Sequence, residues 1–187
     1  FGDRLLIQSA IYQINRSNAK DLDPNTQVLV ASSEPKQRLR GFEFGLSGTV
    51  TPDLLITANY AYVDAKIRDA YASGARDTMS IGNQVRYVPR HAASLWTSYK
   101  PLEGSLKGLE VGVGANYQSK VYLNNTNTQV APAYATFDAL LGYNFGKYRI
   151  AVNGYNLGDR LYYAQVNGGR VVPSAGRSVL VTFGASF

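Results

Sequence analysis

Two short stretches have the residue types and spacing of known binding sites. Asp21, Asp23 and Asn25 have the alternating spacing that opens a calcium-binding loop. The sixth position of such a loop needs glycine and is Thr26 here, so only a weak surface calcium site remains open. The stretch Gly112-Val113-Gly114-Ala115 resembles the start of a dinucleotide fingerprint, but it lies within a strand pattern that no helix follows. We therefore expect no nucleotide site and no metal centre.

His91 is the only histidine and so the only candidate general base for a hydrolase. A serine hydrolase needs a serine, a histidine and an orienting group on one rim. His91 follows Val88-Pro89-Arg90, where a turn entering a strand is the simpler interpretation. The chain has no cysteine, which excludes disulfides and thiolate metal sites. We expect a protein that is not an enzyme and has no covalently bound cofactor.

The charge pattern gives little support for nucleic acid as a partner. The chain has 19 basic and 13 acidic residues, a formal net charge of +6. The basic residues are scattered, and neither a recognition helix nor an aromatic-basic motif accompanies them. We therefore expect no nucleic-acid binding.

The composition favours strands over helices. The chain has 14 tyrosines and 18 glycines but only one methionine, a composition typical of strands and turns. Its 187 residues are enough for one domain of about eight strands. No apolar run approaches the roughly 20 residues of a transmembrane helix. The opening Phe1-Gly2-Asp3 is neither a methionine start nor a signal region, so we expect further sequence upstream.

Period-two alternation recurs along the chain. In ATFDALLGYNF, residues 135–145, every second side chain is apolar and most of those between are small or polar. This pattern is typical of a strand with one apolar and one polar face. Candidate strands that follow or approach it are 4–16, 42–50, 54–64, 91–100, 109–118, 135–145, 148–157 and 178–187.

The connections between these strands alternate in length. Short ones at 51–53, 101–108 and 146–147 alternate with longer polar ones at 17–35, 65–90, 119–134 and 158–176. Short and long connections on opposite ends are typical of an antiparallel, up-and-down transmembrane β-barrel of the outer membrane. A soluble β-sandwich would also alternate, but it would not place every long connection at one end.

The two faces of the candidate strands differ in kind. Aromatic residues near strand ends suit the interfacial girdles of a membrane barrel. They are Tyr60, Tyr62, Tyr99, Tyr117, Tyr143, Phe145, Tyr148, Phe183 and Phe187. The opposite faces are rich in Gly, Ser and Asn, which fill a narrow eight-stranded barrel poorly and suit a wide lumen occupied by something else.

Seven short motifs occur in order along nearly the whole chain. They are RGFEF (40–44), YAYVDA (60–65), GN (82–83), VPRHAASLW (88–96), YATFDA (134–139), NLGDRLYY (156–163) and the terminal phenylalanine. Together they resemble the carboxy-terminal part of TonB-dependent outer-membrane receptors, particularly ferric-siderophore receptors of the ferrichrome or hydroxamate type. Gly158 stands where the family usually has phenylalanine.

The resemblance implies a barrel of about 22 strands around an amino-terminal plug, importing an iron chelate by coupling to TonB. Residues 1–187 would then be the C-terminal barrel segment, without the plug. The implied location is the outer membrane of a Gram-negative bacterium, with the lipid bilayer and lipopolysaccharide as neighbours. The final strand, through Phe183 and Phe187, resembles the signal read by the barrel-assembly machinery.

Ligand contacts are expected on the long connections, because the resemblance makes these external. Tyr122, Tyr162, Tyr163 and Asn167 are the candidate ligand-binding residues, and packing within a girdle or loop is the competing role for each tyrosine. Arginines in the long connections could complement an anionic chelate. They are Arg76, Arg86 and Arg170. A ferric siderophore is the expected ligand, with haem and cobalamin left open.

One structural alternative makes the chain an autonomous eight-stranded outer-membrane barrel that serves as an anchor or adhesin. It requires residues 1–16 to pair with the final strand, which would close both edges of the sheet. A larger barrel would leave both edges of this segment unpaired within the chain. The two hypotheses therefore differ in whether the first and the last strand of the chain pair with each other.

Overall fold

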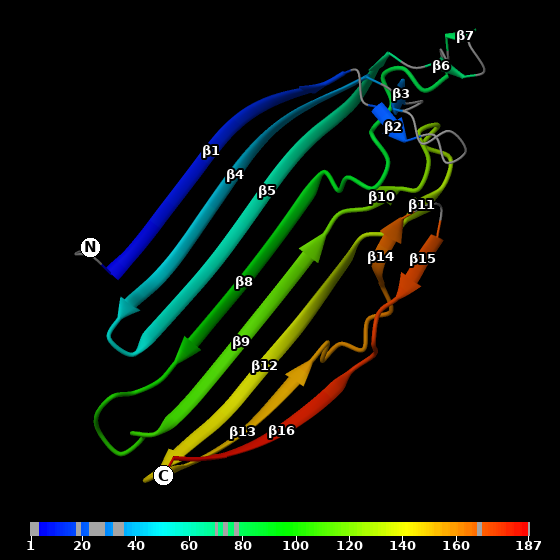
Figure 1. The fold of residues 1–187 in the computed structure, drawn as a ribbon. Helices are drawn as coiled ribbons and strands as arrows, with labels where there is room; N and C mark the ends of the chain where they lie inside the picture. Colours follow the sequence, from blue (N-terminus) through cyan, green and yellow to red (C-terminus); the bar gives the residue numbers. More distant parts are fainter. Residues whose placement is uncertain are drawn as a thin grey trace.

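The computed structural model describes residues 4–17, 20–22, 29–31, 36–69, 71–72, 75–76, 79–167 and 170–186. Eight long strands form one antiparallel sheet in which neighbours in the chain are neighbours in space (Figure 1). They are β1 (Leu5–Arg16), β4 (Lys36–Thr51), β5 (Leu54–Asp69), β8 (His91–Tyr99), β9 (Leu109–Gln118), β12 (Tyr134–Phe145), β13 (Tyr148–Tyr155) and β16 (Ser178–Ala185). The expected all-β, up-and-down arrangement is therefore confirmed.

Four small hairpins occupy the long connections, which gather at one end of the sheet (Figure 1). We call this the outer end and the opposite one the turn end. The hairpins are β2 (Lys20–Leu22) with β3 (Leu29–Ala31), β6 (Tyr71–Ala72) with β7 (Ala75–Arg76), β10 (Val121–Tyr122) with β11 (Val130–Ala131), and β14 (Tyr163–Asn167) with β15 (Arg170–Pro173). The alternation of short and long connections thus separates the two ends as expected.

The strand bounds differ most from expectation in β4 and β5. The sequence pattern predicts a start at residue 42 and an end at residue 64, whereas the strands begin at Lys36 and end at Asp69. The connection expected at 65–90 is correspondingly shorter. The extra residues are mostly charged or polar, so they interrupt the apolar stripe on which the prediction depends.

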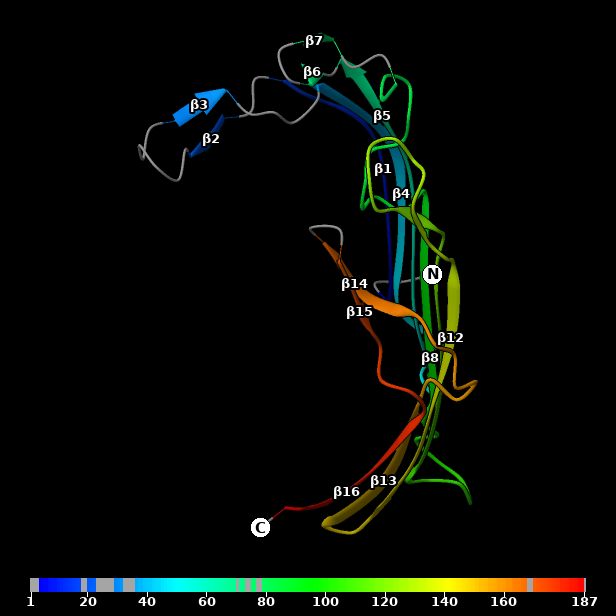
Figure 2. The ribbon, with the colours of Figure 1, turned by 90° about the vertical axis from the view of Figure 1, so that its right-hand side faces the viewer.

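The sheet is one curved layer with two edges (Figure 2). Strands β1 and β16 stand at opposite ends of the strand order, and no pairing between them occurs in the part of the chain that the structure describes. An open arc of this kind does not favour the autonomous eight-stranded barrel, which needs these two strands to pair. Among the described residues, no helix has the length and hydropathy needed to cross a membrane.

One face of the sheet, which we call the apolar face, carries exposed hydrophobic side chains. Leu141 pairs with Val111 on one side and with Val152 on the other, and Val152 pairs with Val181. Cross-strand partners share a face, so these four side chains form one row. Their exposed fractions run from 38% to 61%, far above those of a packed core. An apolar surface of this extent requires an apolar environment.

Aromatic rings line the apolar face at the turn end. The ring centroids of Tyr143 and Phe145 are 6.3 Å apart, those of Phe145 and Tyr148 5.7 Å, and those of Tyr148 and Phe183 5.8 Å. The chain reverses between Phe145 and Tyr148 through Gly146, whose φ of 62° suits a tight hairpin turn. These four rings have the arrangement of an interfacial girdle. Phe187 lies outside the described residues.

A small hydrophobic core forms at the outer end, beside the extension of β5. Ala65, Ile67 and Val85 are buried there, and four further side chains pack against them. These are Leu39, Val63, Ile81 and Val88. The backbone N–H of Val85 donates to the carbonyl of Ala65 at 3.0 Å, so the segment before β8 continues the sheet where β8 is absent.

Two long connections, 79–90 and 119–131, are joined by hydrogen bonds beside this core. The backbone N–H of Gln84 donates to Asn127 Oδ1 at 2.9 Å, and Asn127 Nδ2 donates to the Gln84 carbonyl at 2.8 Å. Asn127 has a φ of 58°, a left-handed conformation that asparagine tolerates well. The outer end therefore holds an ordered platform built from residues 79–90 and 119–131.

Candidate functional site

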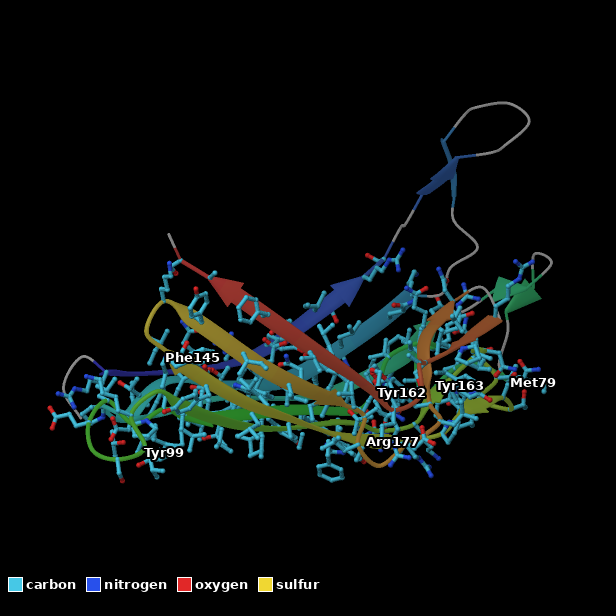
Figure 3. All side chains as sticks on the ribbon, turned by 90° about the horizontal axis from the view of Figure 1, so that it is seen from below. Met79, Tyr99, Phe145, Tyr162, Tyr163 and Arg177 are labelled. Carbon is cyan, nitrogen blue, oxygen red and sulfur yellow. The ribbon has the colours of Figure 1, made fainter. Side chains whose placement is uncertain are left out.

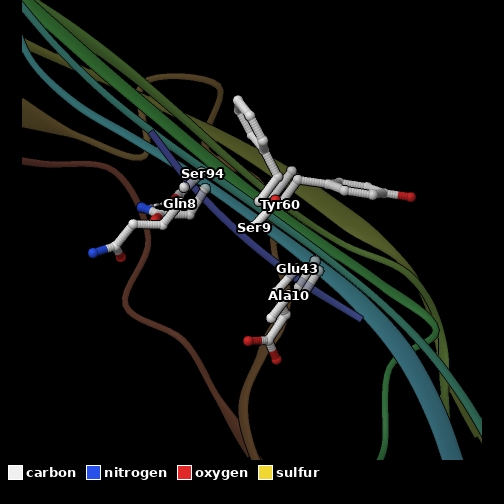
Figure 4. Close-up of a pocket in the computed structure, with 12 residues that line it drawn as sticks. Gln8, Ser9, Ala10, Glu43, Tyr60 and Ser94 are labelled. Carbon is white, nitrogen blue, oxygen red and sulfur yellow. Dashed lines mark hydrogen bonds between the residues drawn. The ribbon is translucent and has the colours of Figure 1, made fainter. Parts of the chain in front are cut away.

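The face opposite the apolar one, which we call the polar face, holds a hollow of about 430 Å³ between β1, β4, β5 and β8. Its floor consists of small side chains from successive strands, including Ala10, Gly45, Ala61 and Ser94. Figure 4 shows Gln8 and Glu43 on one side of the sheet and Tyr60 on the other. A broad surface of small residues suits contact with another folded segment better than enclosure of a small ligand.

A second hollow, of about 330 Å³, lies at the outer end of the polar face. The rings of Tyr134 and Tyr162 stack there, with centroids 4.1 Å apart and planes at 22°. The other lining residues are Asn116, Thr136, Asp138, Tyr155, Asn156, Ala175, Gly176 and Ser178. An aromatic wall beside amide and carboxylate groups can bind a mixed apolar and polar ligand.

The carboxylate in this hollow is held in place by neighbouring groups. Asp138 Oδ1 accepts from the backbone N–H of Asn156 at 2.8 Å, and its Oδ2 accepts from Asn116 Nδ2 at 3.4 Å. Asp138 therefore joins three elements of the polar face. These contacts fix the position of the Asp138 carboxylate in the hollow.

Of the four candidate ligand residues, only Tyr162 lines this hollow. Tyr122 belongs to β10, where Lys120 Nζ lies 5.3 Å from its ring centroid. Tyr163 and Asn167 are the ends of β14 and pair with Pro173 and Arg170. Figure 3 shows Tyr162 and Tyr163 at the outer end, far from Tyr99 and Phe145 at the turn end. The four candidates thus share an end of the molecule but do not form one site.

His91 is placed on the apolar face. Its Nδ1 is 2.9 Å from the hydroxyl of Tyr60, and its ring centroid is 5.2 Å from that of Tyr62. The hydroxyl of Ser119 accepts from the backbone N–H of His91, not from its ring. This geometry gives no support to a hydrolytic site. Asp23 and Asn25 of the calcium pattern lie outside the described residues.

Trp96 is a polar-face residue that the sequence patterns do not reveal. It lies opposite Gly114 in the neighbouring strand, and its ring covers both Gly112 and Gly114. A Cβ built on either glycine would come within 2.6 Å of the indole. Gly112 and Gly114, which resemble part of a nucleotide fingerprint, therefore leave the space in which the Trp96 ring packs.

Asn156 holds the long connection after β13 at both of its ends. Its side chain accepts from the Arg160 backbone N–H at 2.9 Å. It also donates to the carbonyls of Arg160 at 3.0 Å and Ala175 at 3.3 Å. The residue is only 6% exposed. The asparagine of the NLGD stretch therefore fixes the rim on which Tyr162 stands.

The substitution Asn156→Ala is expected to lower the stability of the complete protein by about 2–3 kcal/mol. It removes three part-buried hydrogen bonds, to the N–H and carbonyl of Arg160 and to the carbonyl of Ala175, and losing a hydrogen bond of this kind costs about 1 kcal/mol. The check is the thermal unfolding midpoint in detergent. Asn153→Ala, on the polar face of the preceding strand β13, is the matched control. Equal midpoints for the two variants would contradict the proposed role of Asn156.

Solved and sequenced relatives share this architecture. A probable TonB-dependent siderophore receptor, PiuA of Acinetobacter baumannii, is 35% identical over 96% of this chain and 24% of the relative. The crystal structure of the siderophore receptor PiuA superposes with a TM-score of 0.81, at 32% identity, over 98% of this chain and 26% of that one. The chain thus spans about a quarter of the length of these relatives.

The relatives differ in the chelate that their names specify. The ferrichrome outer membrane transporter/phage receptor of Escherichia coli is 28% identical over 86% of this chain and 21% of its own length. The ferric-catecholate import receptor Fiu of Escherichia coli superposes with a TM-score of 0.75, at 26% identity, over 100% of this chain and 26% of that one. Similarity to these relatives therefore does not distinguish a hydroxamate receptor from a catecholate receptor.

The family model that matches is described as TonB dependent receptor-like, beta-barrel, and it covers residues 1–157. That range includes seven of the eight long strands, from β1 to β13. The relatives are named as receptors and transporters rather than enzymes. The chain therefore belongs to the TonB-dependent receptor family, as a segment of its β-barrel.

Proposed function

We propose that this chain is the C-terminal barrel segment of an outer-membrane receptor that imports a ferric siderophore. The observation that carries the proposal is the open, two-faced sheet, with an exposed apolar face, a polar face of small residues and all long connections at one end. The apolar face would contact the bilayer of a Gram-negative outer membrane, and the polar face would line the lumen. The receptor would bind and transport its ligand without covalent chemistry.

The partners of the complete receptor follow from this proposal. A plug domain, encoded outside residues 1–187, would occupy the lumen and rest on the small residues of the 430 Å³ hollow. TonB would act through that missing part. Phe183 and Phe187 would serve as the assembly signal, and the exposure of Phe183 on the apolar face, 68%, leaves its ring accessible.

The ligand is proposed to be a ferric siderophore of the hydroxamate type, with ferric catecholates as the competing class. Both classes are named among the relatives, and both offer apolar surface and oxygen atoms to an aromatic rim. Tyr162 is the strongest of the four candidate residues, because it stacks on Tyr134 at the edge of a hollow on the polar face. Tyr122, Tyr163 and Asn167 would contact ligand from the neighbouring connections.

Removal of the Tyr162 ring is expected to weaken chelate binding about tenfold, since a stacked aromatic contact is worth about 0.5–1.5 kcal/mol beyond its buried area. The comparison is Tyr162→Ala with Tyr162→Phe in the full receptor, using iron-55-labelled hydroxamate and catecholate chelates on whole cells. The Phe variant keeps the ring and is expected to bind nearly normally.

Tyr99→Ala, at the turn end of the sheet, is the matched control for loss of an exposed tyrosine. The chelate that the wild-type receptor binds decides between the two siderophore classes. An unchanged affinity of Tyr162→Ala for that chelate would remove Tyr162 from the binding site. Binding of neither class would reject the siderophore proposal itself.

A further inference from the structure

The connection between β8 and β9, residues 100–108, is a short turn that displays apolar side chains. Leu102 is 52% exposed and Leu106 is 54% exposed. Figure 2 shows this connection directed away from the sheet, on the side opposite β14 and β15. Tyr162 and Ala175, which flank the hairpin of β14 and β15, line the hollow on the polar face. The connection 100–108 therefore projects on the side of the apolar face.

Hydrogen bonds hold this turn at both of its ends. The backbone N–H of Leu102 donates to Asp53 Oδ1 at 2.9 Å, and the backbone N–H of Lys100 donates to the Asp53 carbonyl at 2.7 Å. At the other end, the backbone N–H of Asn144 donates to the Gly108 carbonyl at 2.8 Å. The exposed leucines therefore stand on a turn whose two ends are fixed to neighbouring parts of the sheet.

A hollow of about 630 Å³ lies between this turn and the end of β12. Tyr143 and Phe145, whose rings lie on the apolar face, contribute an aromatic surface to it, and Leu102 adds an aliphatic one. Its cations are Lys100 and Lys107, both of which are exposed. Neither lysine forms an ion pair in the part of the chain that the structure describes. The hollow thus combines apolar surface with two ammonium groups that lack a counter-charge.

The carboxylates at the turn end do not neutralise this hollow. Glu110 Oε2 is 2.8 Å from Arg149 Nη2, and Asp53 Oδ1 accepts the hydrogen bond from Leu102. Glu103 is exposed on the turn but does not line the hollow. An anion that enters the hollow would therefore meet two cations and no carboxylate, which favours its binding.

The position of the two lysines limits what that anion is. Aromatic rings and exposed leucines adjoin them, so a soluble anion would leave this apolar surface in water. A lipid satisfies both parts, because its phosphate can reach the lysines while its acyl chains lie along the rings. In the outer-membrane placement proposed above, the turn end lies at the periplasmic leaflet, which consists of glycerophospholipids.

We propose that this hollow binds the headgroup of an anionic glycerophospholipid of the periplasmic leaflet, with Leu102 and Leu106 inserted among the acyl chains. The stems of Lys100 and Lys107 would cover apolar surface while their ammonium groups stay at the level of the phosphate. The turn would then anchor this end of the barrel wall in the bilayer. The inference rests on the proposed outer-membrane placement and concerns the end of the molecule opposite the Tyr162 hollow.

The first test measures binding of phosphatidylglycerol and of zwitterionic phosphatidylethanolamine to the purified full-length receptor in detergent, by native mass spectrometry. The wild type is expected to prefer phosphatidylglycerol. The double variant Lys100→Gln, Lys107→Gln is expected to lower this preference by more than about tenfold, since each nearby cation strengthens binding to an anionic lipid about fivefold. The matched control, Lys120→Gln with Arg160→Gln, removes two exposed cations from the outer end and is expected to keep the preference.

Three outcomes of this measurement would overturn the proposal. The first is equal binding of both lipids by the wild type, and the second is an equal loss of preference in the two double variants. The third is complete displacement of phosphatidylglycerol by millimolar glycerophosphoglycerol, its deacylated headgroup, because it would indicate a site for a soluble anion.

A second measurement tests whether the turn enters the bilayer. Leu106→Cys and Val152→Cys are each labelled with an environment-sensitive fluorophore, in a full receptor otherwise free of cysteine, and folded into vesicles that contain brominated phosphatidylglycerol. Val152 is exposed on the apolar face in the middle of β13, so quenching is expected at both positions. Quenching at position 152 alone would overturn the inference and leave the membrane placement standing. Quenching at neither position would mean that the membrane placement itself has failed.

Discussion

The substitution Val152→Arg is expected to destabilise the membrane-inserted receptor by about 2–4 kcal/mol, the usual cost of a cation on the lipid side of a barrel near the bilayer midplane. Val152 lies at the middle of β13 and pairs with Leu141 and Val181, both of which are exposed on the apolar face. An arginine at position 152 would have no charged partner in Leu141 or Val181. The same substitution would cost little if this face were bathed in water.

Asn153→Arg is the matched control, because Asn153 follows Val152 in the same strand and points to the polar face. Its cross-strand partners are Leu140 and Leu180, and a lumen has room and water for a long charged side chain. Folding of both variants of the full receptor into vesicles, followed by urea titration, gives the two free energies. Similar values would contradict the assignment of the two faces to lipid and lumen.

The sequence predicts most of this architecture because the two surroundings of a barrel wall impose a period of two on each strand. Residues 109–118 and 135–145 follow that period and correspond closely to β9 and β12, and 148–157, which follows it less cleanly, still locates β13. The prediction is wrong where the environment changes. Beyond Phe42 and Asp64 the strands leave the apolar band and carry charge, and they persist because residues 83–90 hydrogen-bond beside β5.

The candidate site depends on contacts between distant segments, which a strand pattern does not encode. The sequence shows Tyr162 as an aromatic residue in a long connection. Its stack on Tyr134 depends on the fold of that connection, whose two ends are joined by the hydrogen bond from Asn156 to the Ala175 carbonyl. The cover of Trp96 over two glycines likewise depends on the register between β8 and β9. The residue type alone therefore makes Tyr162 a candidate, whereas the role of Trp96 becomes clear only from the pairing register of β8 with β9.

The substitution Gly114→Ala is expected to destabilise the receptor by about 1–3 kcal/mol, the usual cost of overpacking. The added Cβ would lie 2.6 Å from Trp96 Cε3, and the rigid indole can relieve this only by leaving its position. Gly112→Ala meets the same ring 2.6 Å from Cζ2, so the two substitutions should have similar effects. Gly184→Ala is the matched control, because Gly184 is also a strand glycine on the polar face and an added methyl group there would have no neighbour within 4 Å.

A double-mutant cycle isolates the contact between the two strands. In the background of Trp96→Ala the ring is gone, so Gly114→Ala should then cost close to nothing, and alanine is the better strand residue by some tenths of a kcal/mol. Thermal unfolding midpoints of the four proteins give the coupling between positions 96 and 114. Additive effects would contradict the packing of Trp96 on Gly114. A large coupling would mean that the register of β8 on β9 is maintained by one aromatic ring and the space that two glycines leave for it.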